Sequence, residues 1–187
     1  MRLQPSPEMV TMGALISTIA VACSRILPFE SEMTLPLASS MTSEPLPFSP
    51  CEWPADRLAT LAETLAVAAA DDGLVMDARA TERYTGEIVA VDPRPGHIPG
   101  AASAPWAATI DQETGKFKSV EELREHFDDL GVRASANVVT YCGSGVSACM
   151  NILAMEHAGL PPARLYVASF SGYSADPERE VELGPGR

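Results

Sequence analysis

Residues 138–148 read VVTYCGSGVSA, and this stretch decides the fold. Its first four residues, Val138–Tyr141, are β-branched or aromatic and predict a short buried strand. The residues Val146–Ala158 are mainly apolar and predict a helix that Gly159 stops. Between the two lies a turn of small residues that begins at Cys142. A strand, a tight turn and a helix in this order are typical of an α/β protein with a parallel sheet.

A helix is also predicted for Pro54–Ala70, which is rich in strong helix formers. The proline suits its first turn. We expect one stripe of this helix to face the core, and its members are Leu58, Leu61, Leu65 and Ala69. A further helix, Ser119–Leu130, opens with a capping box and ends before Gly131.

The other predicted strands are short and apolar: Leu74–Met76, Ala101–Ala104 and Leu165–Val167. They alternate with the predicted helices along the chain. This alternation predicts an α/β fold with a parallel central sheet flanked by helices on both faces. In such sheets functional turns follow the carboxyl ends of the strands, which is where Asp77–Arg79 and the Cys142 turn fall.

Residues 1–52 differ in composition and predict an irregular N-terminal extension before one domain at 53–187. Five prolines in residues 28–50 exclude a long helix or a central strand, so we expect a disordered linker there. Residues 9–22 are apolar but too few to cross a bilayer comfortably. Export or membrane anchoring through residues 9–23 remains a minor alternative to a cytoplasmic location.

The formal net charge of -12 argues against nucleic acid and against an anionic membrane surface as partners. The four cysteines are irregularly spaced, which predicts neither a disulfide framework nor a zinc site. A reducing compartment is therefore the expected setting. The sequence also predicts no metal site and no organic cofactor.

Chemistry is expected at Cys142, between the predicted strand and the predicted helix. A turn of small residues can direct backbone N–H groups toward one point, and the helix that follows adds its positive end. Both effects favour a thiolate, the reactive form of cysteine. Gly143 and Gly145 permit close backbone approach, and Ser144 and Ser147 can add hydroxyl donors.

The turn has two alternative interpretations. A cysteine at a strand end is often only a small buried apolar residue. The flanking glycines argue against that interpretation for Cys142, whereas Cys149 lies inside the predicted helix and is assigned to the core. Cysteine phosphatases carry an arginine six residues after the cysteine, but that position is Ala148 here. A phosphatase is therefore rejected.

Five segments in order along the chain resemble one known family. They are the Cys142 turn, Val75–Arg79, Glu82–Gly86, Gly96–Ala101 with Ala104–Trp106, and Ser174–Pro177. Together they resemble the rhodanese family, and more closely the catalytic C-terminal domain of tandem thiosulfate and 3-mercaptopyruvate sulfurtransferases. The resemblance implies a rhodanese-like fold for the domain and a sulfurtransferase activity.

The resemblance also implies roles. Cys142 is expected to take a sulfane sulfur as a persulfide and to pass it to a thiophilic acceptor, such as cyanide or a thiol. The loop that stabilises the added sulfur comprises Gly143, Ser144, Gly145, Val146, Ser147 and Ala148. Arg83 is expected to hold an anionic donor, with help from Arg94. Asp77 and Arg79 are expected to form a buried structural ion pair, and His97 to shape its turn.

Donor preference is left open between thiosulfate and 3-mercaptopyruvate. The loop after Cys142 carries no charge, which resembles family members that use 3-mercaptopyruvate. The closing motif departs from the family at Phe170, Gly172 and Tyr173, and Ala104 stands where an asparagine is expected.

Residues 1–52 are too few to supply the inactive rhodanese domain that precedes this domain in tandem members. The alternative is a truncated, weakly active module that serves in sulfur relay or partner binding. A partner domain or self-association would then cover the site.

Overall fold

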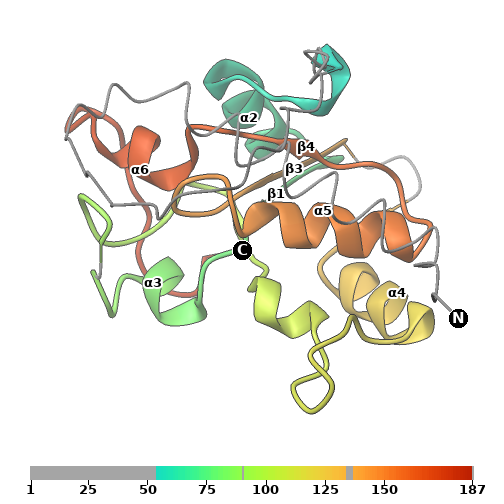
Figure 1. The fold of residues 1–187 in the computed structure, drawn as a ribbon. Helices are drawn as coiled ribbons and strands as arrows, with labels where there is room; N and C mark the ends of the chain where they lie inside the picture. Colours follow the sequence, from blue (N-terminus) through green and yellow to red (C-terminus); the bar gives the residue numbers. More distant parts are fainter. Residues whose placement is uncertain (1–53, 90, 134–136, 187) are drawn as a thin grey trace, which may run out of the picture. The chain divides into compact units, whose positions relative to one another are not determined.

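A computed structural model describes residues 54–89, 91–133 and 137–186 (Figure 1). The predictions for the apolar segment 9–22 and for the proline-rich stretch 28–50 lie outside the described residues. No helix within the described part of the chain is long and apolar enough to cross a membrane.

Four parallel strands form the central sheet in the order β2-β1-β3-β4. Their bounds are Gly73–Asp77 for β1, Ala102–Ser103 for β2, Asn137–Tyr141 for β3 and Arg164–Leu165 for β4. β1 and β3 pair along their whole length, with Leu74 opposite Val138 and Asp77 opposite Tyr141. The predicted parallel sheet is confirmed.

Helices cover both faces of the sheet, as predicted (Figure 1). α4 (Val120–Asp129) and α5 (Ala148–His157) pack on one face. The other face carries α2 (Leu61–Ala68), α3 (Thr81–Thr85) and α6 (Ser169–Ser174). Two short 3-10 helices complete the described elements, η1 (Ala55–Arg57) and η2 (Trp106–Thr109).

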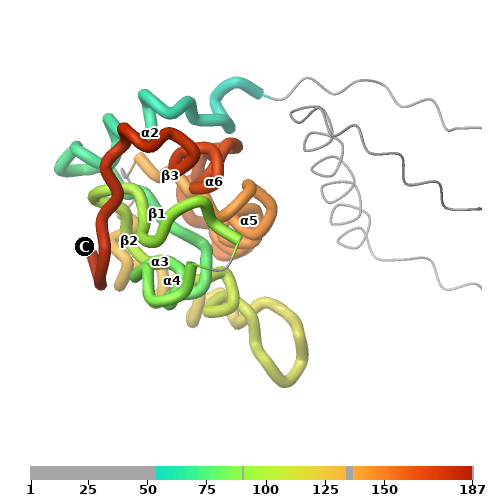
Figure 2. The backbone as a smooth tube through the Cα atoms, turned by 90° about the vertical axis from the view of Figure 1, so that its left-hand side faces the viewer, coloured from blue at the N-terminus to red at the C-terminus, as the bar shows by residue number. Residues whose placement is uncertain are grey.

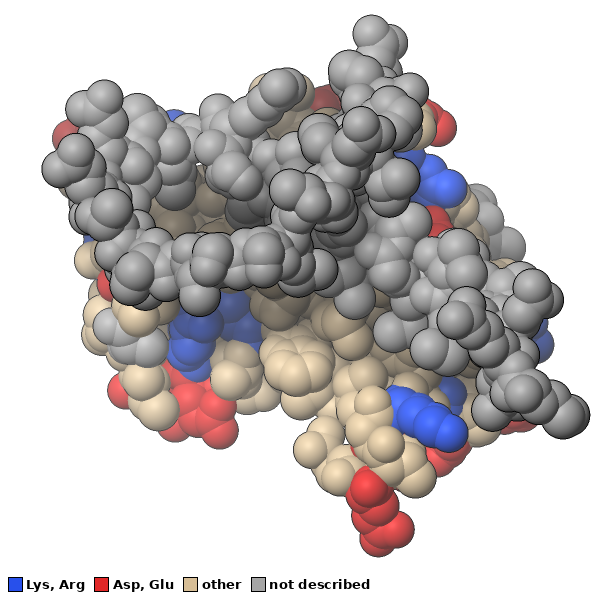
Figure 3. All heavy atoms as spheres, in the orientation of Figure 1, with Lys and Arg blue, Asp and Glu red and all other residues tan. Residues whose placement is uncertain are grey.

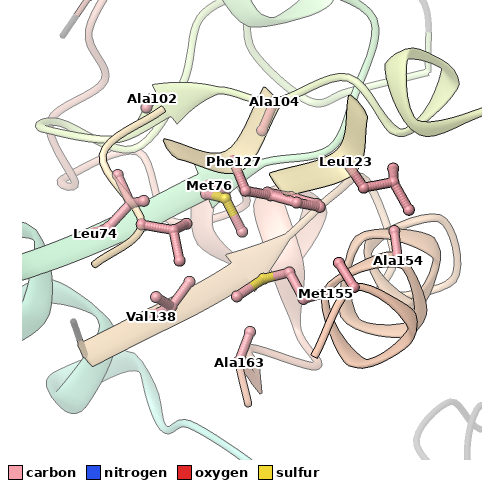
Figure 4. Packing of buried hydrophobic residues seen from close by; sticks show 12 residues of the cluster. Leu74, Met76, Ala102, Ala104, Leu123, Phe127, Val138, Ala154, Met155 and Ala163 are labelled. Atoms are coloured by element: carbon pink, nitrogen blue, oxygen red, sulfur yellow. The ribbon is translucent and has the colours of Figure 1, made fainter. Parts of the chain in front are cut away.

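Alternation along the strands divides the core into two clusters, because successive side chains point to opposite faces. Leu74, Met76 and Val138 meet Phe127 of α4 and Met155 of α5 on one face (Figure 4). The residues between them on β1 and β3 face α2 and α6 instead. Cys142 follows the end of β3 directly and is buried.

The helix predicted for Pro54–Ala70 was wrong in extent. The structure has η1, then an extended segment in which Ala59 N–H donates to the Leu165 carbonyl at 2.9 Å, and only then α2. Thr60 caps α2 through a reciprocal capping box with Glu63. Pairing with β4 therefore prevents the helix from starting at Pro54.

The apolar stripe predicted on this helix was right only in part, because Leu61 packs against the core cluster on this face of the sheet but other members do not. The side chains that α2 buries are Thr64 and Val67, whereas Leu65 is 38% exposed and Ala69 is exposed. The buried face of α2 is therefore rotated from the predicted one, toward Thr64 and Val67. The Ser119 capping box of α4 and the stop at Gly131, whose φ is +95°, are confirmed.

A buried network of charges closes the carboxyl end of β1. Arg79 donates from Nη2 to Asp77 Oδ2 at 2.6 Å, from Nη1 to Asp92 Oδ2 at 3.1 Å and from Nη2 to the Gly96 carbonyl at 2.7 Å. Its guanidinium also lies 3.9 Å from the centre of the Phe170 ring. Burial opposes the charged form, but the hydrogen bonds and charge of Asp77 raise the pKa of Arg79.

The first prediction concerns this network. Replacing Arg79→Met leaves Asp77 buried without its cation and Asp92 with Arg83 alone, and we expect a loss of about 3–5 kcal/mol in the free energy of unfolding. The measurement is urea unfolding of both proteins. The control is Arg133→Met, which removes a solvent-exposed pair with Asp128 and should cost less than about 1 kcal/mol. Equal losses for the two variants would refute the assignment.

Candidate active site

The segments that follow β1, β2 and β3 meet at one edge of the sheet. Ala78 N–H donates to the Tyr141 carbonyl at 2.8 Å, and Trp106 N–H donates to the Ala78 carbonyl at 3.2 Å. Cys142 therefore emerges beside the Asp77–Arg79 pair, as expected for the carboxyl ends of parallel strands.

The sulfur of Cys142 lies inside its own turn. Its Sγ accepts the N–H of Gly145 at 3.1 Å, and the residue is 2% exposed. A donor aimed at sulfur stabilises the thiolate more than the thiol, which makes this cysteine a candidate nucleophile.

The first residues of α6 hold the peptide groups around Cys142. Its N–H donates to Ser169 Oγ at 3.2 Å, and its carbonyl accepts the N–H of Phe170 at 2.9 Å. The Gly143 carbonyl accepts the N–H of Ser171 at 3.0 Å. The turn is thus anchored by a helix that follows it by more than twenty residues.

Gly145 is required by the shape of the turn. Its φ is +87°, and a Cβ there would lie 3.0 Å from the Val167 carbonyl oxygen. In the rest of the loop, Ser144 and Val146 are exposed, while Ala148 is buried. The loop thus contacts the sulfur through a backbone N–H, while the side chains of Ser144 and Val146 are exposed to solvent.

Arg83 lies beside this turn, as its predicted role requires. A Cβ on Gly143 would lie 3.0 Å from Arg83 Nη2. The guanidinium donates from Nε and Nη2 to the two carboxylate oxygens of Asp92, at 2.9 Å and 2.7 Å. Figure 3 shows basic atoms gathered over the region of α3, next to acidic atoms. The side chain is 25% exposed, so it is both fixed and accessible.

Arg94 has other contacts. Its guanidinium donates to the carbonyls of Ser174, Asp176 and Arg179 at 2.8–3.0 Å, and more weakly to that of Pro177. These bonds brace the segment after α6. The predicted contact of Arg94 with a donor stays a prediction, and the observed geometry favours a structural role.

The buried ion pair of Asp77 and Arg79 is confirmed, with both side chains fully buried. His97 stacks on Tyr84 with ring centres 3.7 Å apart, and its Nδ1 lies 2.8 Å from the Tyr84 carbonyl. A carbonyl only accepts, so Nδ1 carries the proton. The His97 peptide pairs with Glu182 in both directions, along the C-terminal segment drawn in red in Figure 2. His97 thus shapes its turn, as predicted.

Tyr141, the residue before the cysteine, has a structural part as well. Burial, and then the charge of Asp77, raise the pKa of its phenol well above the ordinary value. The neutral hydroxyl accepts the N–H of Ile98 at 3.1 Å. This bond ties β3 to the turn that contains His97.

Two residues of the site were missed by the sequence reasoning. Asp92 lies in a loop without local pattern, and it links Arg79 to Arg83. Ser169 stands in the closing motif, but nothing in the sequence marks its contact with Cys142. Ser169 lies 27 residues from Cys142, and Asp92 lies 13 and 9 residues from its two arginines, so neither contact follows from a helix or strand period.

The described cysteines, Cys142 and Cys149, are free thiols. Cys149 Sγ donates to the Gly145 carbonyl at 3.3 Å from a buried position, in agreement with its assignment to the core. Within residues 54–89, 91–133 and 137–186, no group of three His, Cys, Asp or Glu side chains could hold a metal ion.

Comparison with solved structures shows the fold. An anaerobic ergothioneine biosynthesis enzyme from Chlorobium limicola, in complex with trimethyl histidine, superimposes with a TM-score of 0.64 and 19% identity. The match covers 70% of this chain and 32% of that one.

Comparison with curated proteins finds longer relatives. A Pseudomonas aeruginosa protein, named provisionally as a 3-mercaptopyruvate sulfurtransferase, is 42% identical over 66% of this chain and 44% of its own. A Mycobacterium tuberculosis protein, SseB, named provisionally as a thiosulfate sulfurtransferase, is 37% identical over 59% and 38%. The human 3-mercaptopyruvate sulfurtransferase is 38% identical over 60% and 39%. The matched part is therefore less than half of each of these relatives.

A family model provides the assignment. The model of the rhodanese-like domain matches residues 58–176, which include β1 to β4, the Cys142 turn and α6. The chain therefore belongs to the rhodanese-like domain family.

Proposed function

We propose that this chain is a sulfurtransferase that carries sulfur on Cys142. The observation that supports the proposal best is the Gly145 N–H placed 3.1 Å from Cys142 Sγ, inside a rhodanese-like domain. The named relatives, which are sulfurtransferases, support the same reaction class. The donor is thiosulfate or 3-mercaptopyruvate, and the acceptor is cyanide or a thiol.

The reaction has two halves. The Cys142 thiolate attacks the donor sulfur and becomes a persulfide. With thiosulfate the S–S bond breaks and sulfite leaves with the bonding electrons. With 3-mercaptopyruvate the C–S bond breaks and the thiol proton ends on carbon, which gives pyruvate. The acceptor then attacks the outer sulfur, and the electrons of the broken S–S bond return to the Cys142 thiolate.

The loop supplies what this chemistry needs. The terminal sulfur of a persulfide is negative, so the backbone N–H groups of residues 143–148 and the positive end of α5 would stabilise it. Arg83, held by Asp92 beside Gly143, would hold the anionic group of the donor. Ser144 would polarise the donor thiol or carbonyl.

A second candidate is a weakly active module in sulfur relay or partner binding. Apolar side chains near the site favour it: Val146 in the loop is 56% exposed, Trp106 40% and Val91, next to Asp92, 84%. Exposed apolar groups around a site are typical of a surface that another protein covers. Turnover of small donors in the tests below would distinguish the two candidates.

A prediction follows for the cysteines. Incubation with a sulfur donor should add the mass of one sulfur atom to the wild-type chain and to Cys149→Ser, which keeps the nucleophile. Cys142→Ser should gain no sulfur and form no thiocyanate with cyanide. The measurement is intact-protein mass spectrometry together with a thiocyanate assay. A wild-type chain that gains no sulfur from either donor would remove the enzyme proposal.

Donor preference gives another prediction. The loop residues Gly143, Ser144 and Gly145 carry no charge to match the dianion thiosulfate. We therefore expect a higher kcat/KM with 3-mercaptopyruvate than with thiosulfate. Steady-state rates with both donors and the same acceptor would measure it, and faster turnover of thiosulfate would contradict it.

Arg83 is open to a similar test. Replacing Arg83→Met should raise KM for either anionic donor by about 10- to 100-fold, the loss expected for a charge-assisted hydrogen bond, with a smaller change in kcat. Arg83→Lys keeps the charge but loses the paired N–H donors of the guanidinium, so its KM should lie between those of wild type and Arg83→Met. The control is the rate of Cys142 alkylation by iodoacetamide. This reagent is neutral and does not need Arg83, so the rate should not change. An unchanged KM in Arg83→Met would rule out this role.

A further inference from the structure

Ser169, the first residue of α6, has an unusual backbone. Its φ is +51°. No other non-glycine residue in the described part of the chain has a positive φ. The residue is completely buried. A side chain disfavours this left-handed conformation, and glycine would adopt it more easily. Strained residues of this kind persist where the surrounding structure requires them.

The hydroxyl of Ser169 has a fixed orientation. It donates its single proton to the Tyr166 carbonyl at 3.0 Å, so its lone pairs are left to accept. One of them accepts the N–H of Cys142 at 3.2 Å. Among the described residues, this N–H has no other acceptor. Removing the hydroxyl would therefore leave a buried donor without its acceptor.

The left-handed turn at Ser169 also directs the next two N–H groups of α6. Phe170 N–H reaches the Cys142 carbonyl at 2.9 Å, and Ser171 N–H reaches the Gly143 carbonyl at 3.0 Å. Three hydrogen bonds from consecutive residues thus hold the backbone on both sides of the Cys142 side chain. Two come from the backbone of α6, and only the Ser169 bond depends on a side chain.

We propose that Ser169 is a positioning residue for Cys142. Its Oγ fixes the Cys142 peptide in the orientation that places Sγ against the Gly145 N–H. This inference rests on the proposed function, in which Cys142 carries the sulfur. Without the hydroxyl, the Cys142 peptide rotates toward another acceptor, and Sγ moves away from the Gly145 N–H. The thiolate then loses the stabilisation that this N–H provides. Sulfur uptake then slows, whereas donor binding at Arg83 is unaffected.

A purely structural role makes a different prediction, and glycine separates the two. Ser169→Gly removes the hydroxyl but adopts the +51° backbone without strain. If only the turn matters, this variant is as stable and as reactive as wild type. If the hydroxyl positions Cys142, the variant folds but reacts slowly. Ser169→Ala removes the hydroxyl and keeps the strain, so it provides a second variant.

The test compares these variants in the full chain with a matched control, Ser174→Ala. Ser174 is a buried serine of the same helix whose Oγ donates to the Phe170 carbonyl at 2.7 Å. The measurements are the melting temperature, the rate of Cys142 alkylation by iodoacetamide at fixed pH, and kcat and KM with 3-mercaptopyruvate.

We expect both Ser169 variants to slow alkylation and kcat by about tenfold or more, the effect of a buried donor left unpaired, with KM unchanged. Ser174→Ala should react at the wild-type rate. The proposal is overturned if Ser169→Gly reacts like wild type, whatever its melting temperature, or if Ser174→Ala slows Cys142 equally. Alkylation needs no sulfur donor. A wild-type chain that forms no persulfide would therefore defeat the proposed function, while the alkylation rates would still decide the role of Ser169.

Discussion

The guanidinium of Arg79 lies between the buried carboxylates of Asp77 and Asp92 and against the ring of Phe170. Two series of contacts lead from this cation to the cysteine turn, one through Asp92 and one through Phe170. Asp92 also bonds Arg83, which lies against Gly143, and Phe170 donates its N–H to the Cys142 carbonyl. Buried charges cost free energy to desolvate and do not by themselves stabilise a fold. Their value here is geometric, because one ionic centre sets the positions of both the proposed anion-binding group and the nucleophile.

Local patterns in the sequence predicted the parts of the molecule that local physics determines. The strand before Cys142, the capping box at Ser119 and the left-handed stop at Gly131 each depend on neighbours within a few residues. The first helix was misplaced because Ala59 bonds to β4, a partner more than a hundred residues away. Asp92 was not predicted, because it lies in a loop without local pattern and its partners Arg79 and Arg83, 13 and 9 residues away, meet it only in the folded chain.

The buried side of the site is held by hydrogen bonds and ion pairs, and its outer side exposes apolar side chains to solvent. Inside, the peptide groups around Cys142 are bonded to α6, and the neighbouring carboxylates are paired. Outside, Val146 and Trp106 expose apolar surface beside the cysteine, and the relatives continue well beyond the matched length. For the proposed sulfurtransferase, the reactivity of the sulfur would then depend on this domain, and the selection of the donor also on what binds to its surface.

The contact on the Cys142 sulfur comes from a peptide N–H, that of Gly145, and not from a side chain. A main-chain donor survives most substitutions around it, provided that the glycine keeps its φ of +87°. Ser144 and Val146 are exposed, so both can be substituted while the Gly145 N–H keeps its contact with the Cys142 sulfur. For the proposed function, such a division would let the loop surface change to suit other donors while the backbone contacts on Cys142 stay the same.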